Sequence, residues 1–467
     1  MANDHRAAGS AWAASSSHSA TSNERPGSLL AFCSFTFGFG KTSHSATRGG
    51  AFRDNGSMTA GRGDTPRVSL FPVFLIVLVD VFGMTLVIPL LAIYAETLNA
   101  TPLQATMLIS VFAACQLVSG PLIGHMSDRV GRKPMLLISQ IGTLIGFIVM
   151  ARAHVLWMLY LARVLDGSTA GNLSLAQAYI SDHTEPSQRA KSFGLIGIAF
   201  GIGFFIGPSL TGYLSAKYSL TTPIYLAACM SALSILCTAT LLKGGRQSHH
   251  AFDDREGAFQ WKTYAKYFSR PGLRERLFQF LFFITSFSLF ISGFALFAER
   301  RFTYQGHPFG PREIGYVFGY VGFLGIILQG GLIGRLVKRF GESTLVAAGF
   351  VALAIGYFGL GIASSFGLLI VTGTLAAFGN GVIRPALTSL ITQQAGRQEQ
   401  GVVLGITQSL MSMASIVAPI VAGLLIEHRM LTAWAWVAAG LAAIGVALSR
   451  EGLTFYATAS ADSIGTP

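Results

Sequence analysis

Charged side chains are scarce in this chain. Asp, Glu, Lys and Arg make up 12% of the 467 residues, while apolar residues make up 51%. Soluble domains carry about twice that charged share, so this composition excludes an ordinary soluble domain and indicates an integral membrane protein. The formal charge is +12. Its basic residues are scattered between apolar stretches and do not line one face, so we expect no nucleic-acid partner.

Cysteine motifs and catalytic signatures are also missing. The four cysteines, Cys33, Cys115, Cys229 and Cys237, form no CxxC or other paired spacing, so we expect neither a disulfide framework nor a metal site. The sequence has no GxxxxGK[ST] phosphate loop and no HExxH or GxSxG motif. We therefore predict no cofactor, no direct ATP drive and no enzymatic activity, although a membrane-embedded enzyme is an alternative of another class.

Long apolar runs dominate from about Leu70 onward. There are twelve of them, and each is long enough to cross a bilayer as a helix. The continuous runs exclude a transmembrane barrel, whose strands would alternate. The predicted fold class is an all-α integral membrane protein with twelve transmembrane helices. The expected spans are 70–95, 103–124, 135–152, 155–180, 192–217, 222–242, 277–298, 313–334, 343–363, 366–393, 401–426 and 431–449.

One long polar segment, 243–276, divides these spans six and six. We predict a six-helix half over 67–242, a cytoplasmic linker over 243–276, and a second six-helix half over 277–450. Residues 1–66 and 451–467 are expected to be disordered extensions. Met58 lies just before the first span, so a misassigned start is an alternative explanation of the leader.

The distribution of Lys and Arg predicts the orientation. If the N-terminus is cytoplasmic, twenty of these residues flank the spans on the inner side and six on the outer side. The positive-inside rule then places both termini in the cytoplasm. Arg300, Arg301 and Arg312 run against the rule, because they cluster on the outer side.

The two halves share an internal repeat. At an offset of 210 residues, Gly120, Gly124, Arg129 and Gly131 match Gly330, Gly334, Arg339 and Gly341. At an offset of 211, Gly194, Pro208 and Gly212 match Gly405, Pro419 and Gly423. Two matches at nearly one spacing predict a duplicated bundle with a cavity between its halves.

The stretch GHMSDRVGRK resembles the loop signature of the major facilitator superfamily. The signature residues are Gly124, Asp128, Arg129, Gly131, Arg132 and Lys133. The resemblance implies that this cluster holds the halves together when the transporter is open to the outside and releases them when it opens inward. The alternative is that its basic residues only fix the topology.

Three further stretches, LVDVFGMTLVIPLLAIY, YLARVLDGSTAGN and the one beginning RAKSFGLIGIAFG, resemble the tetracycline-efflux-like group of drug:proton antiporters. The fifth span carries that branch's antiporter motif through Gly194, Gly203, Gly207, Pro208 and Gly212, with Thr211 in place of one glycine. The resemblance implies export, whereas ordinary small-residue helix packing is the alternative.

Four ionisable residues lie well inside the spans: Asp80, Arg163, Asp166 and Arg384. Such groups are costly in lipid unless they are paired, hydrated or used. We predict that Asp80, Arg163 and Asp166 couple transport to protons. Asp80 is the leading proton carrier or, alternatively, the partner of a cationic substrate group. A structural ion pair in span four is the alternative for Arg163 and Asp166.

A polar cavity between the halves would bind the substrate. Its candidate residues are Gln116, Gln140, Asn172, Gln177, Asn380, Arg384 and Gln408. Arg384 could attract an anionic substrate group or bond to backbone carbonyls freed by Pro385. Tetracycline exporters carry further carboxylates where this chain has Gly146 and Leu353, so another amphipathic drug or a metabolite is at least as good a candidate substrate.

The sequence thus predicts a secondary transporter that uses protons to export a small amphipathic molecule. Its partners would be that small molecule, protons and the lipid bilayer, and it is expected to be a monomer in a plasma membrane, with the bacterial inner membrane as the expected site. A proton-coupled importer with the same fold and a transport-dead sensor are the alternatives within this architecture.

Overall fold

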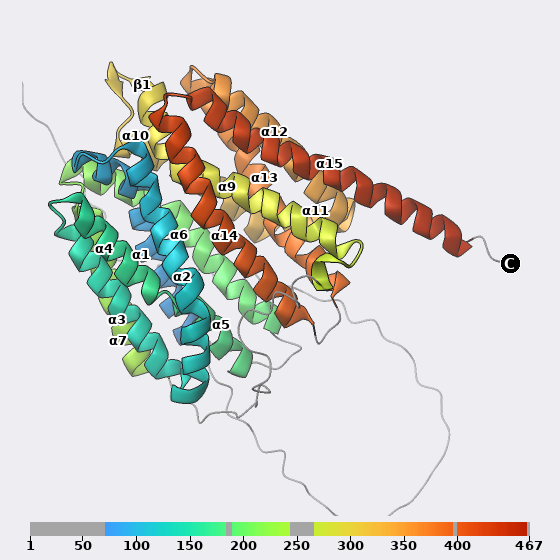
Figure 1. Cartoon of the computed structure of the whole chain (residues 1–467), viewed down its shortest axis with the longest axis horizontal. Helices are drawn as coiled ribbons and strands as arrows, with labels where there is room; N and C mark the ends of the chain where they lie inside the picture. Colours follow the sequence, from blue (N-terminus) through green and yellow to red (C-terminus); the bar gives the residue numbers. More distant parts are fainter. Residues whose placement is uncertain (1–70, 184–188, 243–265, 396–398, 465–467) are drawn as a thin grey trace, which may run out of the picture. The chain divides into compact units, whose positions relative to one another are not determined.

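The structure of the chain, a computed structural model, consists almost entirely of α-helices (Figure 1). It describes residues 71–183, 189–242, 266–395 and 399–464, and within these ranges the side chains of 71, 181–195, 401 and 450–464 are not described. The leader 1–66 and most of the linker 243–276 therefore lie outside the described residues, and the predictions made for them remain predictions.

The first half contains seven helices among the described residues. They are α1 (Phe71–Thr97), α2 (Pro102–Val130), α3 (Arg132–Ala151), α4 (Leu156–Ser168), α5 (Asn172–His183), α6 (Arg189–Lys217) and α7 (Thr222–Leu241). Helix α1 packs against α6 and α7, and α3 packs against α4 and α7.

The second half begins with α9 (Leu273–Arg301), which is followed by a short antiparallel hairpin of β1 (Thr303–Tyr304) and β2 (His307–Pro308). Its other elements are α10 (Pro311–Ile327), the π-helix η1 (Leu328–Leu332), α11 (Ile333–Phe340), α12 (Glu342–Ile362), α13 (Phe366–Gln394), α14 (Gln400–Glu427) and α15 (Leu431–Ile464). Stacked aromatic rings fill its core, where the Phe290 ring lies 5.2 Å from that of Tyr357 and 6.3 Å from that of Trp434, measured between centroids.

Eleven spans among the described residues are long and apolar enough to cross a membrane. The all-α membrane fold is confirmed. The predicted continuous fourth span, 155–180, is wrong, because the structure breaks it into α4 and α5 with Thr169, Ala170 and Gly171 between them (Figure 1). Thr169 and Gly171 are weak helix formers, but the apolar residues on both sides of them make the hydropathy of the segment look continuous.

The C-terminal end also differs from the prediction. Helix α15 continues past Arg450 to Ile464, so the backbone of 451–464 is helical, where the sequence analysis expected a disordered tail. This segment contains no proline and only Gly452 as a helix breaker, and the preceding span provides the nucleus that a short helix needs.

The internal repeat is visible in the backbone at two matched glycines. Gly131 joins α2 to α3 with φ +105°, and Gly341 joins α11 to α12 with φ +78°. Residues with a Cβ rarely adopt this conformation, so both copies need glycine at the same turn.

Candidate functional site

The two halves meet near one end of the bundle. We call the end where α1 finishes and α2 begins the Glu96 end, and the end where α2 gives way to α3 the Asp128 end. Arg300 Nη2 of α9 lies 2.5 Å from Glu96 Oε1 of α1. The Leu103 N–H of α2 donates to Glu427 Oε2 of α14 at 3.0 Å. These polar contacts tie the second half to the first at the Glu96 end.

Helices α6 and α10 also cross between the halves, with almost no space between their backbones. A Cβ added at Gly315 of α10 would lie 2.5 Å from the Pro208 carbonyl oxygen of α6, and one at Gly322 would lie 2.5 Å from that of Phe204. The contact continues to Gly201, whose Cβ would lie 3.5 Å from Ile326. The π-helix η1 follows directly, and π-turns inside helices often occur at functional sites.

The halves separate toward the Asp128 end. Ser110 of α2 donates to the Ile416 carbonyl of α14 at 2.7 Å, so these positions mark the facing sides of the two helices. Gly124 lies about four helical turns after Ser110, and Gly405 about three turns before Ile416, so both point toward the opposite half. A Cβ at either glycine would meet no atom within 4 Å, so α2 and α14 do not pack against each other at these two positions.

The loop signature is arranged around the turn at Gly131. Asp128 Oδ1 lies 2.7 Å from Arg132 Nη1, and the Arg132 guanidinium also donates to Ser127 Oγ. The Lys133 ammonium donates to the Ala239 carbonyl of α7 at 2.8 Å. Each of these contacts lies within the first half. The six signature residues therefore lie at the open end of the bundle.

Asp80 belongs to a cluster of polar side chains inside the first half. Its carboxylate forms hydrogen bonds with Ser234 of α7 and Asn172 of α5. Gln140 Nε2 of α3 donates to Ser234 Oγ at 2.8 Å, which leaves the Ser234 hydroxyl proton directed at the carboxylate. The cluster thus joins Asp80 with Gln140 and Asn172, two residues that sequence reasoning assigned to the substrate cavity.

The predicted pair in α4 lies beside this cluster. Arg163 Nη2 is 3.1 Å from Asp166 Oδ2, and both residues are buried. The Arg163 guanidinium also stacks over the Phe112 ring at 5.4 Å from its centroid. Asp166 accepts a hydrogen bond from Thr143 and is near enough to Asp80 for the two charges to interact. The three residues predicted for proton coupling are therefore close together.

The break between α4 and α5 is stabilised from α3. The Ser139 hydroxyl donates to the Thr169 carbonyl and accepts from the Gly171 N–H at 3.0 Å. These bonds add to the backbone hydrogen bond from the Gly171 N–H to the Thr169 carbonyl at 2.7 Å and fix the chain where the helix is interrupted. Ser139 was missed in the sequence analysis, since a lone serine in an apolar span gives no signal of such a role.

Gly146 explains one departure from the tetracycline exporters. A Cβ there would lie 3.1 Å from Asp166 Cβ and 3.2 Å from the Ala162 carbonyl oxygen. A carboxylate side chain on α3 would thus collide with α4. In this chain the space beside Gly146 is occupied by Asp166 of α4.

The antiporter-motif glycines bring α6 close to two neighbours. A Cβ at Gly207 would lie 2.3 Å from Thr85 Oγ1 of α1, and one at Gly212 would lie 2.8 Å from the Pro311 carbonyl oxygen of α10. Thr211, which replaces a glycine of the motif, donates to the Leu86 carbonyl at 2.7 Å. The side-chain surroundings of Gly194 lie outside the described residues.

The remaining predicted cavity residues do not form one cluster. Asn380 Nδ2 donates to the Tyr357 hydroxyl at 3.3 Å within the second half. Arg384 is exposed, and its Nη2 lies 4.0 Å from Met411 Sδ of α14. Gln177 and Gln408 are exposed and Gln116 is half-buried.

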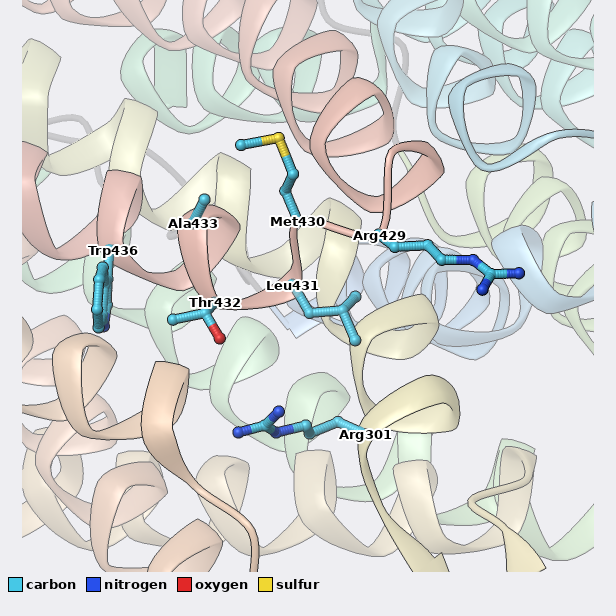
Figure 2. Close-up of a pocket in the computed structure, with 7 residues that line it drawn as sticks. All are labelled: Arg301, Arg429, Met430, Leu431, Thr432, Ala433 and Trp436. Atoms are coloured by element: carbon cyan, nitrogen blue, oxygen red, sulfur yellow. The ribbon is translucent and has the colours of Figure 1, made fainter.

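A surface pocket of about 380 Å³ lies at the Glu96 end, between α9 and the start of α15. Figure 2 shows that the Arg429 guanidinium points away from Thr432 and Trp436, while that of Arg301 extends beneath Thr432. None of the predicted site residues lines this pocket. It is therefore separate from the polar cluster.

Comparisons with known proteins agree with this architecture. A family profile described as the Major Facilitator Superfamily matches residues 73–342 and 309–456. The tetracycline resistance protein, class B, of Escherichia coli is 29% identical over 375 residues, which cover 78% of this chain and 90% of that protein. The quinolone resistance protein NorA of Staphylococcus aureus (strain MRSA252) is 27% identical over 383 residues, which cover 82% and 94%.

A solved structure shows the same fold. The human organic anion transporter MFSD10 (TETRAN) superposes with a TM-score of 0.64 at 22% sequence identity, covering 83% of this chain and 100% of that chain.

Proposed function

Because this chain belongs to the major facilitator superfamily, whose members are membrane transporters, we propose that it exports a small amphipathic drug or metabolite in exchange for protons. The observation that carries the proposal is the buried cluster of Asp80, Arg163 and Asp166, since carboxylates inside a membrane bundle are costly unless they are used. The relatives named for tetracycline and quinolone resistance favour export over import.

Asp80 is the proposed proton carrier. As a carboxylate it accepts hydrogen bonds from Ser234 and Asn172, and binding a proton removes the charge that those bonds stabilise. The Arg163–Asp166 pair tunes this step, because Asp166 repels a second negative charge and Arg163 offsets it.

The two ends of the bundle supply alternating access. We propose that the Asp128 end is cytoplasmic, as the distribution of Lys and Arg indicates, so that the structure is open to the cytoplasm. Gly124, Asp128, Arg129, Gly131, Arg132 and Lys133 then form the gate that closes this end when the Glu96 end opens. The protein would act as a monomer in a bacterial inner membrane, without enzymatic activity.

The test is transport in proteoliposomes with a defined proton gradient. Tetracycline and a quinolone are the first substrates to try, and accumulation should follow the gradient and be lost when an ionophore removes it. Asp80→Asn should abolish gradient-driven accumulation while binding of the drug survives. Gradient-driven transport by Asp80→Asn at the wild-type rate would refute the assignment of the proton to Asp80. Lys217→Gln, which removes a charge at an exposed residue of the same half, serves as the matched control.

A further inference from the structure

Arg384 of α13 is a cation without an anionic partner among the described residues. Its one polar contact there is the 4.0 Å approach to the Met411 sulfur, which is a weak acceptor. Two other arginines within the spans have partners: Arg163 forms an ion pair with Asp166, and the buried Arg276 donates to Gln279 Oε1 at 2.9 Å.

The carboxylates described in the second half do not pair with Arg384. They lie near helix ends, and most of them bind other groups. Glu299 pairs with Arg300, Glu313 caps Gly310, Glu342 binds Ser389 and Gln393, Glu399 pairs with Arg270, and Glu427 binds Leu103. Glu275 lies in the first turn of α9.

The other explanation for this arginine is a bond to backbone carbonyls that Pro385 leaves free. In the described structure the guanidinium makes no such bond, and the Arg384 carbonyl itself accepts from the Thr388 hydroxyl at 2.8 Å. Bonding to carbonyls freed by Pro385 therefore does not explain why an arginine lies at this position.

The guanidinium faces water and not lipid. Arg384 lies ten residues before the end of α13, about 15 Å along the helix, where exposure to lipid would cost several kcal/mol. Its side chain is exposed, yet protein atoms surround it on several sides, as they do around a side chain that lines an internal cleft. Helix α13 packs against α9, α10, α12 and α14 of its own half. The remaining direction is the space between the halves, which is open at the Asp128 end.

We propose that Arg384 binds an anionic group of the transported molecule, so that the substrates are aromatic or amphipathic organic acids, including zwitterions. The inference rests on the proposed transport function and adds the charge class of its substrate. A carboxylate would pair with the guanidinium through two parallel hydrogen bonds, and the flexible Met411 side chain beside it would contact the apolar body. The carboxylates of the first half then remain available to protons.

The experiment compares an acid with its neutral amide. Nalidixate and nalidixamide share one aromatic body and differ in a carboxylate against a carboxamide. Binding to the purified full-length protein is measured from the shift in its thermal unfolding midpoint, without any gradient. We expect wild type to bind the carboxylate at least about tenfold more tightly than the amide, because hydrogen bonds to charged groups are the stronger ones.

Three variants decide the assignment. Arg384→Gln should remove the preference for the carboxylate and leave amide binding unchanged, and Arg384→Lys should restore part of it because the charge is kept. Arg335→Gln, which removes an exposed arginine of α11, should keep the full preference. Equal binding of acid and amide by wild type, or an unchanged preference in Arg384→Gln, overturns the inference.

Failure of the proposed function has a different signature. If protons do not drive transport, the gradient experiment with Asp80→Asn fails while the carboxylate preference at Arg384 persists. If Arg384→Gln does not fold, its unfolding transition is absent, and Arg384→Lys then decides: a preference for the carboxylate smaller than that of Arg335→Gln would support the inference, and a preference equal to it would overturn the inference.

Discussion

The contact between α6 and α10 makes a quantitative prediction about the balance between the two open states. A methyl group added by Gly315→Ala would lie 2.5 Å from the Pro208 carbonyl oxygen and 2.9 Å from Gly212 Cα, both of which are backbone atoms. Backbone cannot rotate out of the way as a side chain can. The helices must separate by about 0.9 Å to reach ordinary contact distance, and overpacking of this kind costs typically about 1–3 kcal/mol.

The clash destabilises only the state that is closed at the Glu96 end. The α6–α10 contact closes the Glu96 end, so a transporter open at that end does not experience the clash. The equilibrium should therefore shift toward the state open at the Glu96 end by a factor of about 5 to 150. Gly325→Ala is the matched control, because a Cβ at Gly325 of the same helix meets no atom within 4 Å.

The assay is the reactivity of a single cysteine at the Asp128 end. In a cysteine-free background, Gly405→Cys places a thiol on the side of α14 that faces α2, where the structure leaves space. Labelling by a membrane-impermeant maleimide in inverted vesicles should fall in Gly315→Ala and stay unchanged in Gly325→Ala. Equal labelling of the two variants would show that the reasoning about this contact is wrong.

Three further predictions concern single contacts. Glu96→Gln breaks the partly exposed ion pair with Arg300 and should shift the same equilibrium by a factor of only about 1.4 to 5, since such pairs contribute about 0.2–1 kcal/mol. The same labelling assay would report this shift. Gly131→Ala forces a Cβ into a left-handed backbone and should destabilise the protein by about 1–3 kcal/mol, whereas Gly334→Ala should leave the unfolding midpoint unchanged. Ser139→Ala should cost about 1–3 kcal/mol in denaturant unfolding, because two hydrogen bonds of about 0.5–1.5 kcal/mol each are lost.

Hydropathy predicted which residues lie at membrane depth, but not the direction in which each side chain points. Asp80, Arg163 and Asp166 were recognised because charge inside an apolar run is visible in the sequence. Their convergence with Gln140 and Asn172 depends on the rotation of four helices about their axes, which no local pattern specifies.

The ion pair at the Glu96 end was missed, although one signal existed. Arg300 stood out as a basic residue on the outer side, against the positive-inside rule. Its partner Glu96 is 204 residues away in sequence, so only the packing of α1 against α9 joins them. The break in span four was hidden for a related reason, because the serine that stabilises it belongs to another helix.

The break in span four places the residues around Asp80 on two separate helices, α4 and α5. Arg163 and Asp166 belong to α4, whereas Asn172 is the first residue of α5, which runs on toward the Asp128 end. If Asp80 carries the proton as proposed, its neutralisation would weaken the interaction with Asn172 of α5 and would leave the ion pair within α4 intact. Protonation would then act on α5, the helix that leads toward the proposed gate, and not on the first half as a whole.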